Sequence, residues 1–188
     1  MIRLPRTRGF SLSELLITVV ILGILSGLMI DAGVRDWRRE RVNTVVVELA
    51  GWLESVRRAA LKGSSCRVTL TTTSGTLAGG ATLATAADVG SGDGEAIANN
   101  CRSAQPFLLT SLTAHQAFRV RTGNTGGSFV FTPAGTLFPA PEHSSPIEIR
   151  IALADDDDPE RCVQLDGLMG LISVGRVSNG SCNPTSRF

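Results

Sequence analysis

The chain has 188 residues, a formal net charge of +1 and 43% hydrophobic residues. That length suits one modest globular domain plus one long appendage, and a charge so close to neutral excludes a strongly basic or acidic protein. The charge is unevenly placed, however. Arg3, Arg6 and Arg8 lie in the first nine residues without an acidic residue, so removal of this leader would change the net charge from +1 to −2.

An apolar segment follows the basic leader. Residues 10–30 read FSLSELLITVVILGILSGLMI, and the single charge among them is Glu14. As a helix that rises about 1.5 Å per residue, the segment is roughly 30 Å long, which matches the hydrocarbon core of a bilayer. A carboxylate in that core costs about 2.5–3.5 kcal/mol on insertion scales, so Glu14 needs a partner. No basic residue lies within one helical turn of it.

Two ordinary kinds of segment share this hydropathy. A secretory signal peptide should end in a small-x-small cleavage site, but a cut after Ala32 would place Ile30 at the outer small position. An ordinary signal anchor, which would tether an exported domain, fits the hydropathy equally well. Neither alternative explains the carboxylate of Glu14.

The run RGFSLSELL resembles the prepilin signature of type IV pilins and type II secretion pseudopilins. The resemblance lies in Gly9 at the end of a basic leader, in Phe10 after it, and in Glu14 four residues further on. It implies that a prepilin peptidase cuts between Gly9 and Phe10 and N-methylates Phe10. It also implies that Glu14 pairs with the new amino group, on its own chain or on a filament subunit. Ser11 and Ser13 depart from the commoner threonine and large aliphatic residue.

The helical pattern continues beyond the apolar segment. Apolar residues recur every three to five positions and form a stripe on one helix face: Val34, Trp37, Val42, Val45, Leu49, Trp52, Val56 and Ala60. Gly63 and Ser64 predict the helix end. We therefore expect a leader at residues 1–9, a transmembrane and filament-core helix at 10–30, an amphipathic helix at 31–63, and an extracytoplasmic β-rich head at 64–188.

The head is predicted to consist of strands. Segments rich in Val, Ile, Leu, Phe and Thr alternate with turn residues, at 66–73, 106–112, 117–121, 128–132, 147–154, 161–165 and 171–174. Asp166, Gly167 and Gly170 frame a hairpin. Residues 75–100 are rich in Gly, Ala, Thr and Ser and predict a long surface loop with room for a short strand. The predicted class is α+β, with a long N-terminal helix packed on an antiparallel sheet.

The four cysteines form no C-x-x-C pair, which a structural zinc site would usually contain, and His115 and His143 have no ligand-like spacing either. Two disulfides in an oxidising compartment are the better interpretation. The sequence permits three connectivities. We favour Cys66–Cys101 with Cys162–Cys182, because each of these disulfides closes a local loop.

Three further segments resemble the GspH/FimT/FimU group of minor pilins and pseudopilins. They are ELAGWLESVRRAALKGSSCRVTL, SFVFTPAGTLF, and RCVQLDGLMGLISVG with the following Cys182. Residues 75–105 have no counterpart in this resemblance. It implies a subunit that initiates a filament or lies near its tip. It also implies a subunit anchored in the bacterial inner membrane with a periplasmic head, and the other subunits of the filament as partners.

Other chemistries have weaker support. The acidic run at residues 155–158 predicts a solvated turn rather than a calcium site, and no catalytic motif, cofactor motif or metal-ligand pattern is present. Some FimT-like minor pilins are associated with DNA uptake, so extracellular DNA is the alternative partner. Its phosphates would contact exposed arginines, for which the candidates are Arg119, Arg121, Arg150, Arg176 and Arg187.

Overall fold

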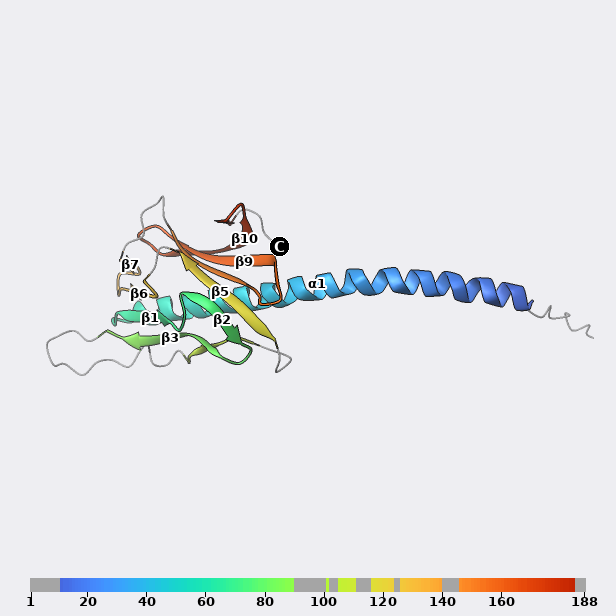
Figure 1. Cartoon of the computed structure of the whole chain (residues 1–188). Helices are drawn as coiled ribbons and strands as arrows, with labels where there is room; N and C mark the ends of the chain where they lie inside the picture. The colour runs from blue at the N-terminus through green and yellow to red at the C-terminus, as the bar shows by residue number, and fades with distance from the viewer. Residues whose placement is uncertain are drawn as a thin grey trace, which may run out of the picture. The chain divides into compact units, whose positions relative to one another are not determined.

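The computed structural model describes residues 11–89, 101, 105–110, 116–123, 126–139 and 146–184, and of residues 28–35 and 156–158 it describes the backbone alone. One helix and eleven strands lie in this part of the chain. The chain divides into two compact units between Arg38 and Arg39. The first contains the beginning of the helix, and the second contains the rest of the helix and all the strands (Figure 1).

Helix α1 (Leu12–Ala60) contains both predicted helical segments in one element. It begins two residues after the predicted start at residue 10 and ends three residues before the predicted end at residue 63. The backbone N–H of Gly63 donates to the carbonyl oxygen of Ala60 at 3.1 Å. Gly63 has a φ of +111°, which a residue with a side chain rarely adopts, so glycine ends the helix here as the sequence predicted.

The strands form two sheets in which every described pair is antiparallel. The first sheet has the order β4–β3–β1–β6–β7, and the second has the order β11–β10–β9–β8–β5–β2. The strands of the first sheet are β1 (Cys66–Leu70), β3 (Thr82–Asp88), β4 (Phe107–Leu108), β6 (Ser128–Phe131) and β7 (Leu137–Phe138). The strands of the second sheet are β2 (Ser74–Ala78), β5 (Ala117–Gly123), β8 (Ile147–Leu153), β9 (Asp156–Asp166), β10 (Leu171–Ser178) and β11 (Ser181–Asn183). The α+β class predicted from the sequence is confirmed.

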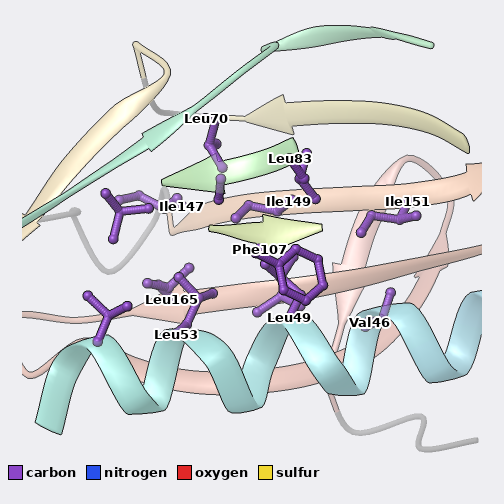
Figure 2. Close-up of a cluster of buried hydrophobic side chains, with 14 of the residues drawn as sticks. Val46, Leu49, Leu53, Leu70, Leu83, Phe107, Ile147, Ile149, Ile151 and Leu165 are labelled. Carbon is purple, nitrogen blue, oxygen red and sulfur yellow. The ribbon is translucent and has the colours of Figure 1, made fainter. Parts of the chain in front are cut away.

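One core joins the second part of α1, residues 39–60, to both sheets. Leu49 and Leu53 of the helix are fully buried, as are Val68 of the first sheet and Ile149 of the second. Figure 2 shows side chains from the helix and from the strands meeting in one cluster. Each fully buried aliphatic side chain contributes about 1.5–3 kcal/mol through the hydrophobic effect, so this cluster is the main stabilising contact of the head.

The buried face of α1 differs in detail from the predicted stripe. Val46 and Leu53 are fully buried although the stripe omitted them, whereas Trp37 is half exposed. The side chain of Val34 lies outside the described residues. Two sheets cover a wider arc of the helix than a single apolar row, so positions beside that row are buried as well. Trp52 lies at the border of this face, where its Nε1–H donates to the carbonyl oxygen of Gln105 at 2.7 Å.

The prediction of a loop at residues 75–100 is wrong for its first half, because strands β2 and β3 lie there. Residues 90–100 lie outside the described part. Strand β3 pairs with β1 over five residues, from Cys66 opposite Asp88 to Leu70 opposite Ala84. Small and β-branched residues form strands when a neighbouring strand provides a ladder, which composition alone does not reveal.

The bounds of two other strands also differ from the predicted ones. The strand predicted at 106–112 contains the two-residue β4, and the one predicted at 161–165 is the eleven-residue β9. The acidic run begins in a turn at Asp155, as predicted, but strand β9 already starts at Asp156. The predicted hairpin is present between β9 and β10, with Asp166 opposite Leu171.

Candidate functional site

The candidate site begins at the N-terminus of α1. The predicted cleavage residues Gly9 and Phe10 lie outside the described residues, so the described part starts at Ser11. The backbone N–H of Ser11 donates to Oε2 of Glu14 at 3.2 Å. This is one half of a capping box, in which a residue in the first turn reaches back to the residue before the helix. The carboxylate also lies where the helix dipole favours negative charge.

The hydrogen bond between the backbone N–H of Ser11 and the carboxylate of Glu14 was not predicted from the sequence. No basic side chain lies near Glu14, so the amino group that cleavage would create was the predicted partner. The signal was nevertheless present, because Ser11 and Glu14 have the S-x-x-E spacing of a capping box before an apolar run. Before any cleavage, therefore, the carboxylate already accepts a hydrogen bond from its own helix.

The first part of α1 exposes apolar side chains on every side. Their exposed fractions range from 49% for Leu25 to 82% for Leu12, and the set also includes Leu15, Leu16, Ile17, Val19, Val20, Ile21, Leu22 and Ile24. A helix that is apolar all round is typical of one that packs in lipid or among other helices. Within the described residues, no helix meets the combined length and apolarity expected of a membrane span.

The few polar groups on this part of the helix are satisfied within it. The hydroxyl of Thr18 donates to the carbonyl oxygen of Leu15 at 2.8 Å, and that of Ser26 donates to Leu22 at 2.7 Å. At Gly23 and Gly27, no atom other than those of the adjacent residues and the helix's own nearby backbone lies within 4 Å of the position that a Cβ would occupy. These two glycines form a G-x-x-x-G row, which permits close approach of another helix backbone.

A groove lies on the second part of α1, on a face that the sheets leave open. It has a volume of about 330 Å³ and is lined by Glu40, Asn43, Thr44, Val47 and Glu48. Val47 is 49% exposed. One side of the groove is fixed by the hydroxyl of Thr110, which donates to Oε2 of Glu48 at 2.6 Å. The groove is therefore an apolar surface with carboxylates at both ends.

The disulfides are Cys66–Cys101 and Cys162–Cys182, which is the pairing favoured from the sequence. Their Cα–Cα distances are 5.6 Å and 5.9 Å, within the usual range for disulfides. Cys66–Cys101 joins the start of β1 to residue 101. Cys162–Cys182 holds β11 against β9, and the backbone N–H of Cys182 also donates to Oε1 of Glu148 at 3.4 Å.

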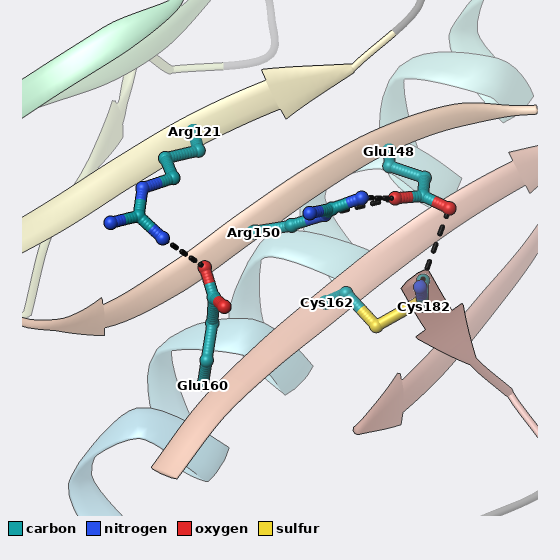
Figure 3. A network of polar contacts seen from close by, with 6 residues as sticks. All are labelled: Arg121, Glu148, Arg150, Glu160, Cys162 and Cys182. Atoms are coloured by element: carbon teal, nitrogen blue, oxygen red, sulfur yellow. Dashed lines mark hydrogen bonds and ion pairs between the residues drawn. A yellow bond between two sulfur atoms is a disulfide. The ribbon is translucent and has the colours of Figure 1, made fainter. Parts of the chain in front are cut away.

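The candidate DNA-contacting arginines do not form one patch. Arg121 makes an ion pair with Glu160 at 3.6 Å, and an Nη of Arg119 donates to the carbonyl oxygen of Ala154 at 2.8 Å. Arg150 lies opposite Arg121 and pairs with Glu148 at 2.5 Å (Figure 3). The two carboxylates offset two of the three arginine charges on this face of the second sheet.

The other two candidate arginines do not add to that face. Arg176 lies opposite Arg161, whose side chain is buried toward the helix, and residues opposite each other on paired strands share one face. Arg176 therefore lies on the other face of the sheet from Arg121. Arg187 lies outside the described residues. The described residues thus provide no continuous basic surface for a phosphate backbone.

Metal binding and catalysis find no support in the described residues. They contain no group of three or more His, Cys, Asp or Glu side chains that could hold a metal ion. His115 and His143 lie outside them. The features that remain to be explained are the capped Glu14, the exposed apolar helix surface and the groove.

Comparison with known proteins identifies the N-terminal segment. A family model described as a prokaryotic N-terminal methylation motif matches residues 4–30. This match agrees with the resemblance noted in RGFSLSELL, and the motif implies processing by a prepilin peptidase. No curated protein matches the sequence.

Two solved structures are similar to the chain. Both are crystal structures of the type IV minor pilin FimU of Pseudomonas aeruginosa, in two space groups. The first is 12% identical, with 77% of this chain and 94% of that chain covered and a TM-score of 0.47. The second is 14% identical, with 74% and 99% covered and a TM-score of 0.45. At such values the similarity carries no argument about function, which must come from the N-terminal motif and the geometry around it.

Proposed function

We propose, from the premise that this chain is a type IV pilin-like protein with an N-terminal methylation motif, that it is a subunit of a type IV pilus or a type II secretion pseudopilus. One observation carries the proposal. Glu14 is the single charge on the described, side-chain-exposed stretch of α1 from Leu12 to residue 27, and that stretch is apolar on all its faces. A surface of this kind needs partners that the chain itself does not provide.

The first step is processing at the leader. Hydrolysis of the bond between Gly9 and Phe10 leaves a carboxylate on Gly9 and an amino group on Phe10. In its neutral form this amine accepts a methyl group from a methylsulfonium donor, which leaves as the thioether, and the methylated amine is cationic. The amino group lies at the edge of the apolar segment, four residues before Glu14. It therefore supplies the positive charge that no side chain near Glu14 can supply.

The second step is recruitment into the filament. While the subunit waits in the inner membrane, the Ser11 N–H partly satisfies the carboxylate of Glu14. An ion pair with an amino group in a low-dielectric environment is stronger than this single hydrogen bond. The exchange of partners would draw the incoming helix into register beside its neighbours, and the open row at Gly23 and Gly27 would let the helices approach closely.

We place this subunit among the minor pilins and pseudopilins, which initiate a filament or lie near its tip. The proposal rests on the segments that resemble the GspH/FimT/FimU group. Its partners are then the prepilin peptidase and the other subunits, and its head lies outside the cytoplasm, where an oxidising environment favours the two disulfides. DNA is not proposed as a partner, because Arg121 and Arg150 of that face are in ion pairs and Arg119 is bound to the carbonyl oxygen of Ala154.

The proposal is tested by the N-terminus of the mature protein. The full chain is purified from host membranes with and without an active prepilin peptidase, and each sample is analysed by intact-mass and peptide mass spectrometry. We expect N-methylated Phe10 as the first residue when the peptidase is active, and the uncut leader when it is not. A mature chain that begins after Ala32, or that keeps Met1 in both strains, would identify an ordinary exported or signal-anchored domain instead.

A further inference from the structure

Trp37 is a large aromatic residue of α1 that the head does not cover. Its side chain is 50% exposed, and among the described side chains of the helix the first buried one is Val42, five positions later. The other tryptophan of the chain, Trp52, lies in the head. Its Nε1–H donates to the carbonyl oxygen of Gln105 at 2.7 Å, and its ring centroid lies 6.1 Å from that of Phe107. The chain thus has one tryptophan held by the head and one that is half open to its surroundings.

The position of Trp37 along α1 corresponds to the edge of a bilayer. Counted from Leu12, where the helix begins, a hydrocarbon core of about 30 Å takes roughly 20 residues and ends near residue 32. The headgroup layer on each side is about 5–8 Å thick, which takes roughly three to five more residues. A helix tilt of about 20° adds only one or two residues to this count. A helix that enters the hydrocarbon at Leu12 therefore carries Trp37 in the headgroup layer on the far side.

The sequence changes character at the same place. Residues 15–30 contain no charged residue, whereas residues 35–41 read RDWRRER. Tryptophan is enriched at membrane–water interfaces, because its ring is apolar and its N–H is a hydrogen-bond donor. Arginine binds phosphate groups through charge-assisted hydrogen bonds. This combination fits a layer of phospholipid headgroups better than it fits hydrocarbon or open water.

We propose that Trp37 lies in the phospholipid headgroup layer at the outer face of the inner membrane and is an interfacial anchor of the subunit before assembly. The apolar ring contacts the first carbons of the acyl chains, and the lipid phosphates lie beside the arginines that flank Trp37 in the sequence. This lipid contact rests on the proposed function, which supplies the membrane anchor.

The charges favour lipid over a second copy of the chain as the occupant. Residues 35–41 have a net charge of +2, from four arginines and two acidic residues. Helix α1 of a second copy in the same membrane would run in the same direction. It would bring the same arginines to the same level, where like charges repel. Phosphate groups have the opposite charge and lie at this level of the bilayer.

The depth of each tryptophan can be measured separately. The full-length variant Trp52→Phe keeps Trp37 as its one tryptophan, and Trp37→Phe keeps Trp52. Each is reconstituted at a low ratio of protein to lipid in vesicles of phosphatidylethanolamine and phosphatidylglycerol. These phospholipids carry a nitroxide quencher either next to the headgroup or at the end of an acyl chain. Flotation on a density gradient measures the fraction of each variant in the membrane.

We expect the shallow quencher to reduce the fluorescence of Trp37 at least about two-fold more than the deep quencher does. Neither should quench Trp52, because that ring is held within the head. The difference in fluorescence between the wild type and Trp37→Phe should show the same preference with Trp52 intact. This difference keeps the measurement valid if Trp52→Phe weakens the head. Mass spectrometry of the two native disulfides checks folding in every sample.

The possible outcomes separate the lipid contact from the membrane anchor. If the chain floats with the vesicles while neither label, or chiefly the deep label, quenches Trp37, the lipid contact is overturned and the anchor stands. Absence of quenching with a blue-shifted emission would identify a protein contact over Trp37 instead. Equal shallow quenching of Trp37 and Trp52 would show that the whole head lies on the bilayer, which also overturns the proposal. A chain that does not float would contradict the anchor and the lipid contact together.

Discussion

The two parts of helix α1, residues 12–27 and 39–60, distribute their apolar residues differently and have opposite surroundings. In the first part, Leu16 and Ile17 are each 58% exposed, whereas Leu49 and Leu53 in the second part are fully buried. The second part carries its apolar residues on one face, which the two sheets cover, and the first carries them on all faces. The comparison teaches that a helix with one apolar face can find its partner within its own chain, whereas a helix that is apolar on all faces needs partners outside it.

The substitution with the largest expected effect is at Glu14, in the first part of the helix. The substitution Glu14→Ala removes the one charge of the helix between Leu12 and residue 27, so we expect at least about a ten-fold loss of the subunit from sheared filaments. Cleavage before Phe10 should continue, because the bond itself is unchanged. The measurements are immunoblotting of filament fractions and mass spectrometry of the N-terminus.

The matched control is Glu54→Ala in the second part of the helix. Glu54 lies 3.7 Å from Arg57, and both side chains are partly exposed. Surface ion pairs of this kind contribute about 0–1 kcal/mol, so we expect normal incorporation and nearly normal stability. Normal incorporation of Glu14→Ala, or equal losses in both variants, would refute the recruiting role of the carboxylate.

The next largest effect is expected on the free energy of unfolding. Here a substitution in the second part of the helix should be costly, whereas one in the first part should not. Leu53→Ala should lower the free energy of unfolding by about 2–5 kcal/mol, because it leaves a cavity in the core. Leu16→Ala, in the exposed part, should change it by no more than about 0.5 kcal/mol. Urea unfolding of both full-length variants in the same detergent, followed by tryptophan fluorescence, provides the comparison. Similar losses in both variants would mean that the first part also packs within the chain.

Loss of the disulfide that holds β11 should lower the free energy of unfolding by an amount in the lower half of the range expected for Leu53→Ala. Replacement of Cys162 and Cys182 by alanine should lower the free energy of unfolding by about 3 kcal/mol on the chain-entropy model for a 20-residue separation. The double replacement of Cys66 and Cys101 should cost about 4 kcal/mol, because the separation is 35 residues. Urea unfolding of the two double variants measures both values. No change in either variant would show that the model overestimates the effect in this head.

The smallest expected effect is at the glycine row. Gly27→Leu should lower incorporation about two- to ten-fold, since its side chain would hold neighbouring helices apart. It should not lower the stability of the helix, because leucine has a higher helix propensity than glycine. Gly51→Leu is the matched control, because Gly51 lies in the second part of the helix and also has open space around the position that a Cβ would occupy. Filament fractions of both variants are compared with the wild type. A greater loss for Gly51→Leu would place the helix contacts in the second part instead.

The features predicted well from the sequence depend on local chemistry. The apolar run, its single carboxylate and the helix end at Gly63 can each be read within a few residues. The disulfide pairing followed from short loops. By contrast, β2 and β3 were missed because their ladders lie on β5 and β1, which composition does not indicate. The position of Arg176 on the opposite face from Arg121 depends on the register of several strands, which a single sequence does not determine.

The contact between Arg161 and Asn43 has a consequence for the helix as a whole. Nε of the buried Arg161 donates to Oδ1 of Asn43 at 2.6 Å, and 118 positions separate the two residues in the chain. A rotation of the helix by one residue, about 100°, would withdraw this acceptor from a guanidinium that water cannot reach. The contact therefore fixes the rotation of the helix about its own axis. Every copy of the protein therefore presents Thr44 and Val47 in the same direction around the helix axis. A neighbour that recognises these two residues always meets them in that direction.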